Sequence, residues 1–147
     1  MRISNIVECL ETIVSVGNEG RSILKNCLSL LHMAAPAEPA GVFSRIERII
    51  SASDDLAWII LMVNRAKASL DSNIKRVKDP EFTMLVRSGR PSTVAIESEI
   101  RMCHDEIRDM EEQLEIAKNL EDYLQHIEKG LDRCVWMLRD KAAYLRV

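Results

Sequence analysis

Aromatic side chains are scarce in this sequence of 147 residues, because two Phe, two Trp and two Tyr make up only 4% of it. A folded core must therefore be built mainly from aliphatic residues. Long apolar runs are also absent: the longest, residues 56–63, has eight residues, whereas a membrane-spanning helix needs about 20. Glu8 and Glu11 interrupt any apolar core of a signal peptide. These absences predict a cytoplasmic protein with no membrane partner.

Signatures of catalysis and metal binding are missing as well. The sequence contains no phosphate-loop lysine motif, dinucleotide fingerprint or nucleophile elbow. None of the three histidines has an acidic residue three positions before it, which excludes the Glu-x-x-His pattern of carboxylate-bridged metal bundles. The four cysteines form no Cys-x-x-Cys pair and are predicted to be free thiols. We expect a protein that is not an enzyme and has no cofactor and no metal.

Glycine and proline divide the N-terminal part of the chain. Apolar residues recur at helical spacing over residues 3–14 and again over residues 23–31, with the sequence Gly17-Asn18-Glu19-Gly20 between them. The stretch 35–41 contains two prolines and is predicted to be a linker. Residues 1–40 are therefore expected to form a short helical pair followed by a linker.

Two proline-free windows, 40–79 and 92–147, predict long helices. Ser44 and Glu47 have the spacing of a capping box, so the third helix is expected to begin at Ser44. Asp79-Pro80 should end it near residue 78, leaving a loop over residues 80–91. The fourth helix should begin near residue 92 and could run to the end of the chain, with Gly130 as its expected bend.

The fourth helix carries two apolar seams with steps of four and three residues, the pattern of a coiled coil. The first comprises Ile96, Ile100, Cys103, Ile107, Met110, Leu114 and Ala117, and the second Leu120, Leu124, Ile127, Leu131, Cys134, Leu138, Ala142 and Leu145. These patterns predict an all-α fold in which residues 41–147 form a long antiparallel helical hairpin or coiled coil. Because one shorter helix cannot cover both seams, we expect a homo-oligomer; a monomeric four-helix packing is the alternative.

Charge is distributed unevenly along the chain. Residues 65–90 carry a net charge of +4 and residues 91–128 a net charge of −8. The basic stretch contains Arg65, Lys67, Lys75, Arg76, Lys78, Arg87 and Arg90. Such a surface could follow a nucleic-acid backbone without reading its sequence. Alternatively, residues 65–78 lie beside residues 93–107 in the predicted hairpin, so that acidic residues there neutralise the cations.

The final helix has a recognisable order of residues. It contains the segments Tyr123-Leu124, Ile127, Leu131, Arg133, Trp136, Leu138-Arg139-Asp140 and Tyr144-Leu145-Arg146. Together with the preceding basic helix and Gly-containing loop, this order resembles the phage recombination mediators of the UvsY type over residues 44–147. The resemblance implies a small helical protein that assembles into rings and binds single-stranded DNA. It also implies that the protein helps to load a RecA-like recombinase onto strands coated by single-strand binding protein.

Particular roles follow from this resemblance for residues of this chain. Arg65 and Lys67 would contact DNA, with Lys75 and Arg76 as additional contacts. The C-terminal helix would drive assembly through Leu131, Trp136, Leu138 and Leu145.

A helical structural or adaptor protein, which docks another helical protein and binds no nucleic acid, is the rival hypothesis. The apolar residues predicted in the loop favour it, because an exposed apolar cluster can occupy a groove of a partner. These residues are Phe82, Met84, Leu85 and Val86.

Overall fold

The computed structural model describes residues 3–89 and 93–145. These residues form five helices and no strand, so the predicted all-α class is confirmed. The helices are α1 (Ile3–Val14), α2 (Gly17–His32), α3 (Pro39–Arg87), α4 (Thr93–Cys103) and α5 (Asp105–Leu145).

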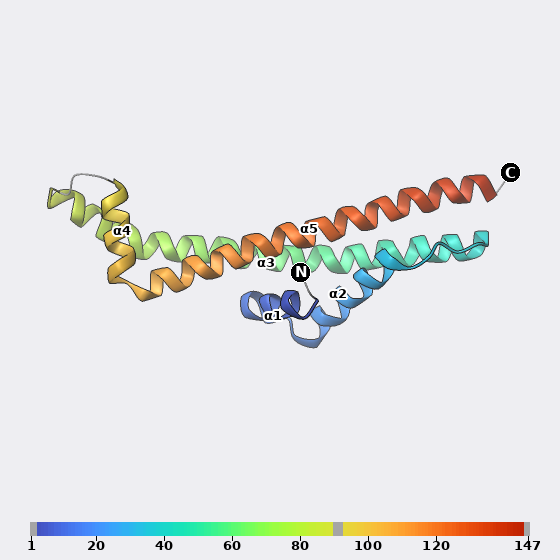
Figure 1. Cartoon of the computed structure of the whole chain (residues 1–147), viewed down its shortest axis with the longest axis horizontal. Helices are drawn as coiled ribbons and strands as arrows, with labels where there is room; N and C mark the ends of the chain where they lie inside the picture. Colours follow the sequence, from blue (N-terminus) through green and yellow to red (C-terminus); the bar gives the residue numbers. More distant parts are fainter. Residues whose placement is uncertain (1–2, 90–92, 146–147) are drawn as a thin grey trace.

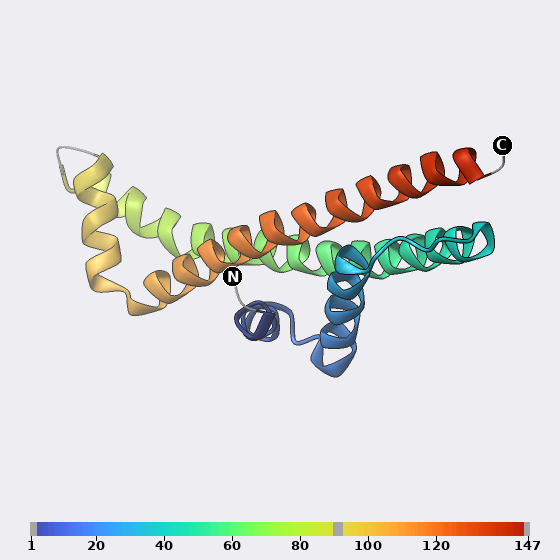
Figure 2. The ribbon, with the colours of Figure 1, turned by 45° about the vertical axis from the view of Figure 1, so that its right-hand side comes forward.

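The two longest helices set the shape of the molecule. α3 and α5 run side by side in opposite directions, and the C-terminal end of α5 lies near the beginning of α3 (Figure 1). α1 and α2 lie on one side of this pair (Figure 2), and both contact α3 as well as α5. α4 lies at the opposite end, beside the last turns of α3. Coiled-coil geometry stays a prediction.

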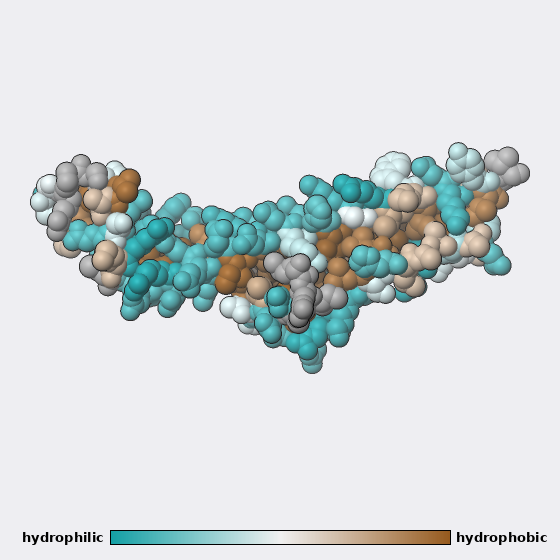
Figure 3. All heavy atoms as spheres, in the orientation of Figure 1, coloured by the Kyte–Doolittle hydropathy of each residue, from teal (hydrophilic) through white to brown (hydrophobic). Residues whose placement is uncertain are grey.

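The main hydrophobic core fills the space among α1, α2, α3 and α5. Its fully buried members include Leu24 from α2, Leu56 from α3 and Leu131 from α5. Fully burying one such side chain contributes about 1.5–3 kcal/mol to folding. In Figure 3, hydrophobic residues gather between α3 and α5 in the half that carries the C-terminus, whereas the half toward α4 is mostly hydrophilic. α1 and α2 thus complete the hydrophobic core between α3 and α5 in the half that carries the C-terminus.

A second, smaller cluster lies at the α4 end, and we call it the tip cluster. It consists of the buried Ile96, Ile100 and Ile107. Partly buried residues packed against it are Val77, Phe82, Leu85 and Met110. The tip cluster joins α3, α4 and the start of α5, so it has its own hydrophobic centre away from the main core.

The expectation of a loop over residues 80–91 is wrong for residues 80–87, because α3 continues through Pro80 to Arg87. A proline inside a helix costs about 3 kcal/mol or more. Burial of Phe82 and Leu85 against the tip cluster offsets this cost. The predicted exposed apolar cluster is therefore divided: Phe82 and Leu85 are partly buried, while Met84 and Val86 remain exposed.

Two further helix boundaries differ from the prediction. α3 begins at Pro39 instead of Ser44, because proline is well suited to the first turn of a helix, where its missing N–H has no partner to lose. The predicted fourth helix is interrupted at His104, which separates α4 from α5. The break lies between Ile100 and Ile107 of the tip cluster, and His104 Nε2 lies 2.5 Å from Glu81 Oε1 on α3.

Gly130 produces no break, because α5 runs through it to Leu145. A Cβ atom at this position would lie 2.9 Å from Cδ2 of Leu31 on α2. Glycine therefore leaves room here for the Leu31 side chain, which would have to shift if a Cβ were added, and the expectation of a bend at Gly130 is wrong.

Candidate nucleic-acid interface

The structure divides the predicted DNA-binding cations into paired and unpaired groups. Lys67 Nζ lies 2.5 Å from Glu121 Oε2, and Lys78 Nζ lies 3.0 Å from Glu111 Oε1. Both lysines are only partly exposed, so their charges are largely used within the α3–α5 pair. The predicted neutralisation within the hairpin is thus correct for these two residues.

The acidic partners are not those expected from the sequence. The sequence predicts that residues 65–78 lie beside residues 93–107, but Lys67 pairs with Glu121 and Lys78 with Glu111. The register differs because α3 runs nine residues past its predicted end at residue 78, to Arg87, and because α4 turns away at the break at His104. The helical period of α3 gives no direct information about this register.

Lys75 forms a local pair with Asp71, one turn earlier on α3, with Nζ and Oδ2 3.3 Å apart. Their side chains are 67% and 53% exposed, and such pairs are worth only about 0.3–0.5 kcal/mol. Lys75 can therefore exchange Asp71 for another anion at little cost. Arg90 lies outside the described residues.

Three arginines of α3 form a row, which we call the arginine row: Arg65, Arg76 and Arg87. All three are exposed, and within residues 3–89 and 93–145 none of them forms an ion pair. They are spaced eleven residues apart, which is about three turns of an α-helix. They therefore lie on nearly the same side of α3, about 16 Å from one to the next along its axis.

A regular row of free cations could hold a phosphate backbone. Arginine presents several N–H donors in a planar fork that matches phosphate oxygens. Side chains repeating over about 33 Å on a straight helix suit an extended strand, and nothing in this geometry distinguishes one base sequence from another. The sequence prediction named all three arginines but gave no means of separating them from the paired lysines.

The predicted oligomer interface is also divided by burial. Leu131 and Leu138 lie in the core of the chain itself, with 0% and 6% exposure, whereas Trp136 is 65% and Leu145 40% exposed. Only Trp136 and Leu145 of this set are accessible to a second chain. The guanidinium carbon of Arg139 lies 5.6 Å from the centre of the Trp136 ring, a cation–π contact on the surface.

Sequence reasoning missed the residues that decide which cations remain free. Glu111 accepts from Lys78 and also from Arg101 Nε at 2.7 Å, so it joins α3, α4 and α5. Glu121 accepts from Lys67 and, in the orientation of Asn64 that satisfies both groups, from the Asn64 amide at 2.9 Å. Only the charge pattern of residues 91–128 hinted at these pairings.

Within residues 3–89 and 93–145, no group of three His, Cys, Asp or Glu side chains is arranged to hold a metal ion. Nor does any helix of those residues combine the length and apolar character needed to cross a membrane. No protein family, characterised protein or solved structure gives a significant match to this chain.

Proposed function

We propose that this protein is a non-catalytic, single-stranded-DNA-binding recombination mediator that helps to load a RecA-like recombinase onto strands coated by single-strand binding protein. The observation that carries the proposal is the arginine row, a line of exposed cations that no described acidic residue neutralises. The resemblance of residues 44–147 to mediators of the UvsY type supports the role in recombination.

The chain has a net charge of −3, so it offers no general attraction for DNA. Binding must instead come from the local surface of α3. Each phosphate that an arginine neutralises releases counterions, and log K falls with log salt by about 0.7 per contact for single strands. Three contacts along the row predict a slope of about −2.

The test is a titration of a fluorescent single-stranded oligonucleotide at several salt concentrations. We compare the wild type with Arg65→Ala/Arg76→Ala and with the control Arg48→Ala/Arg133→Ala, which removes two exposed arginines outside the row. The row variant should bind more weakly, with a salt slope shallower by about 1.4. The control should keep the wild-type slope. Equal slopes for the two variants would show that the row is not the DNA contact.

The recombination step needs a second assay. A RecA-like recombinase is mixed with DNA that is saturated by single-strand binding protein, and its DNA-dependent ATPase is followed over time. The mediator should shorten the lag before ATPase activity, whereas the row variant should not. If the wild-type protein does not shorten the lag, it binds DNA but is not a recombination mediator.

A helical adaptor or self-assembling protein is the second candidate, supported by apolar surface near the C-terminus. Trp136, Met137 and Tyr144 are 65%, 70% and 84% exposed. Trp136 also borders a hollow of about 310 Å³ with Ile50 of α3. Solution mass measured over a range of concentrations tests self-association, and Trp136→Ala should reduce it. A monomeric mass at all concentrations would contradict the predicted homo-oligomer.

A further inference from the structure

Trp58 is an exposed aromatic residue on the same side of α3 as the arginine row. Its side chain is 42% exposed, and it precedes Arg65 by seven residues. Seven residues are close to two turns of an α-helix, so the two positions differ by only about 20° around the axis. They lie about 10.5 Å apart along it, which is shorter than the step of about 16 Å between successive arginines. Trp58 therefore extends the arginine row by one aromatic position.

The surface of α3 between Trp58 and Arg76 is open to a strand. Ser69 and Ser72 are exposed and lie within about 40° of the arginines around the helix. Their small hydroxyl side chains leave room for a strand and can donate hydrogen bonds to its phosphates. The only acidic residue in this stretch of sequence, Asp71, lies about 140° around the helix from Arg76. This side of α3 is thus cationic or polar beyond Trp58.

The neighbours of Trp58 differ toward its two sides along α3. Leu61 is 47% exposed and lies between Trp58 and Arg65, so it provides apolar surface next to the indole. Asp54 is exposed and lies four residues before Trp58, which makes it a neighbour on the helix surface. A carboxylate there repels phosphates. The path of a strand along the arginine row therefore ends at Trp58.

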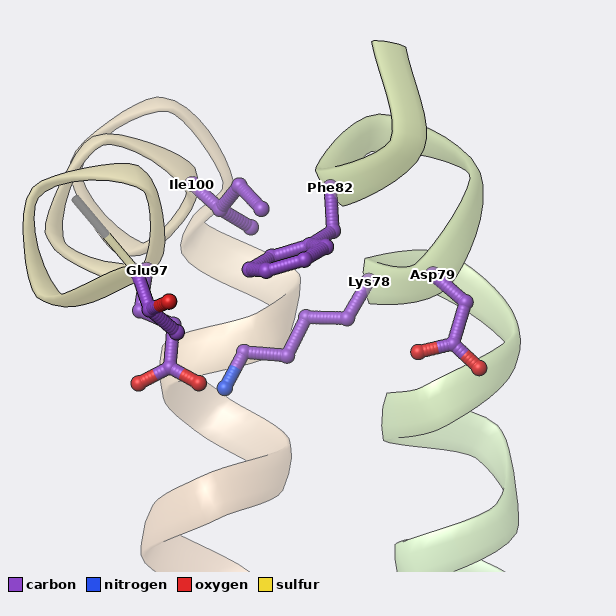
Figure 4. Close-up of a pocket in the computed structure, with 6 residues that line it drawn as sticks. Lys78, Asp79, Phe82, Glu97 and Ile100 are labelled. Carbon is purple, nitrogen blue, oxygen red and sulfur yellow. The ribbon is translucent and has the colours of Figure 1, made fainter. Parts of the chain in front are cut away.

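Phe82 is also an aromatic residue of α3, but it lies on a different side of the helix. It follows Arg76 by six residues, which places it about 120° away around the axis. Phe82 lines a hollow of about 220 Å³ between α3 and α4. In Figure 4 its ring lies above the stem of Lys78, and Ile100 approaches from α4. A strand on the arginine row does not pass this hollow, so Trp58 is the aromatic residue within its reach.

We propose that Trp58 is a stacking platform for one nucleobase of a single strand whose phosphates lie on the arginine row; this deepens the proposed function and rests on it. The indole supplies a face on which any base can stack, while Arg65 holds a phosphate of the same strand two helical turns away. Because stacking tolerates every base, the contact adds affinity without selecting a sequence.

The charge beside Trp58 favours a nucleic acid over an apolar surface of a protein partner. An apolar surface could cover Trp58 and Leu61, but it would also cover Arg65. The Arg65 guanidinium has no ion-pair partner in the part of the chain that the structure describes, and burying an unpaired cation is unfavourable. A single strand brings planar bases and phosphate charges together, so it satisfies the indole and the guanidinium at once.

Fluorescence gives a direct test, because Trp58 and Trp136 are the only tryptophans in the sequence. The Trp136→Phe variant leaves Trp58 as the single emitter, and the Trp58→Phe variant leaves Trp136. Oligo-dT should quench the emission of the first protein, with a midpoint at the Kd measured with a labelled oligonucleotide, and should leave the emission of the second unchanged. An abasic oligonucleotide of equal length carries the phosphates without the bases and should not quench Trp58.

Affinity is compared among the wild type, Trp58→Leu and the control Trp136→Leu, which makes the same chemical change at a residue that is 65% exposed on α5. Trp58→Leu should weaken oligo-dT binding by about fivefold or more, as expected for the loss of one stacked base. The control should bind as the wild type does. Trp58→Phe should keep most of the affinity, because a smaller ring still stacks. The wild type and Trp58→Leu should bind the abasic strand equally.

The salt slope distinguishes this inference from the proposed function. Trp58 carries no charge, so Trp58→Leu should keep the wild-type slope, whereas Arg65→Ala/Arg76→Ala lowers it. A normal slope with equal affinity of the wild type for oligo-dT and the abasic strand overturns the stacking platform and leaves DNA binding by the row standing. No binding to either strand overturns both. Unchanged DNA binding together with lost self-association in Trp58→Leu shows that a second copy covers the indole, and overturns the base assignment.

The variants also guard against a folding artefact. Leucine keeps an apolar side chain at a position outside the buried core, and thermal unfolding followed by circular dichroism checks that Trp58→Leu folds. If that variant is destabilised, the Trp136→Phe protein decides, because it retains Trp58. Quenching by oligo-dT and not by the abasic strand supports the platform there, and absence of quenching at saturating oligo-dT overturns it.

Discussion

Leu131 and Leu145 occupy equivalent places in the sequence pattern but different places in the structure. Both belong to the second apolar seam of α5 and both were predicted to drive assembly. Leu131 is 0% exposed in the main core, whereas Leu145 is 40% exposed at the end of α5. Replacing each by alanine makes the same chemical change in two environments.

The structure gives different magnitudes for the two replacements. Leu131→Ala removes buried methyl groups and leaves a cavity in the main core, so the free energy of unfolding should fall by about 3–4 kcal/mol. Leu145→Ala opens no closed cavity, because water fills the space at the surface, and its cost should be about 1 kcal/mol or less. For a chain of this length, 3 kcal/mol corresponds to a melting temperature lower by about 6–12 °C.

Urea unfolding followed by circular dichroism, repeated over a hundredfold range of protein concentration, measures both effects. The Leu131→Ala cost should not depend on concentration, because the side chain is buried within one chain. A cost below about 1 kcal/mol for Leu131→Ala would contradict the burial of Leu131 in the core. A cost that grows with protein concentration would show that Leu131 contacts a second chain.

The other expectations concern the tip and the buried thiol. Pro80→Ala should stabilise the protein by about 1–3 kcal/mol in urea unfolding, because alanine restores the helix hydrogen bond that proline lacks; destabilisation would mean that residues 80–87 are not helical. Glu111→Ala should speed amide exchange of α4 by about tenfold, because Glu111 holds Lys78 and Arg101; unchanged exchange would show that these ion pairs contribute nothing. Burial raises the pKa of Cys27 to about 11, with the Asp55 carboxylate adding to the effect, so Cys27 should be alkylated at pH 8 at least about tenfold more slowly than Cys134. The raised pKa also means that stability is full below pH 9 and falls as the pH rises from 9 to 11, since the unfolded chain loses the proton first. The Cys27→Ala variant should lack this part of the decline.

The helices were largely predictable because their periodicity is local. The apolar spacing of residues 3–14 and 120–142 identified α1 and the second half of α5, and both helices are present. The errors occur where tertiary packing opposes a local signal. Pro80 should end a helix, yet burial of Phe82 and Leu85 carries α3 past it. Gly130 should weaken a helix, yet α5 continues through it, and its missing side chain leaves room for Leu31 of α2.

The candidate site was predictable only as a set of charges. The distribution of charge along the sequence located the cations between residues 65 and 90. The register of α3 against α5 decides which of them are neutralised. The continuation of α3 through Pro80 and the break at His104 together shift that register, and no proline or glycine marks the break. Lys67 and Arg65 are two residues apart in the sequence, yet the first meets Glu121 and the second points to solvent.

The separation of the tip cluster from the main core has a consequence for how the protein unfolds. The two clusters share no buried side chain, so each end of the long pair can behave as its own cooperative unit with its own free energy of opening. Arg65 follows the buried Val63 of the main core, whereas Arg76 and Arg87 flank the residues of α3 that pack on the tip cluster. A ligand held by all three arginines would therefore join the two units thermodynamically, and the tip would open less often when the row is occupied.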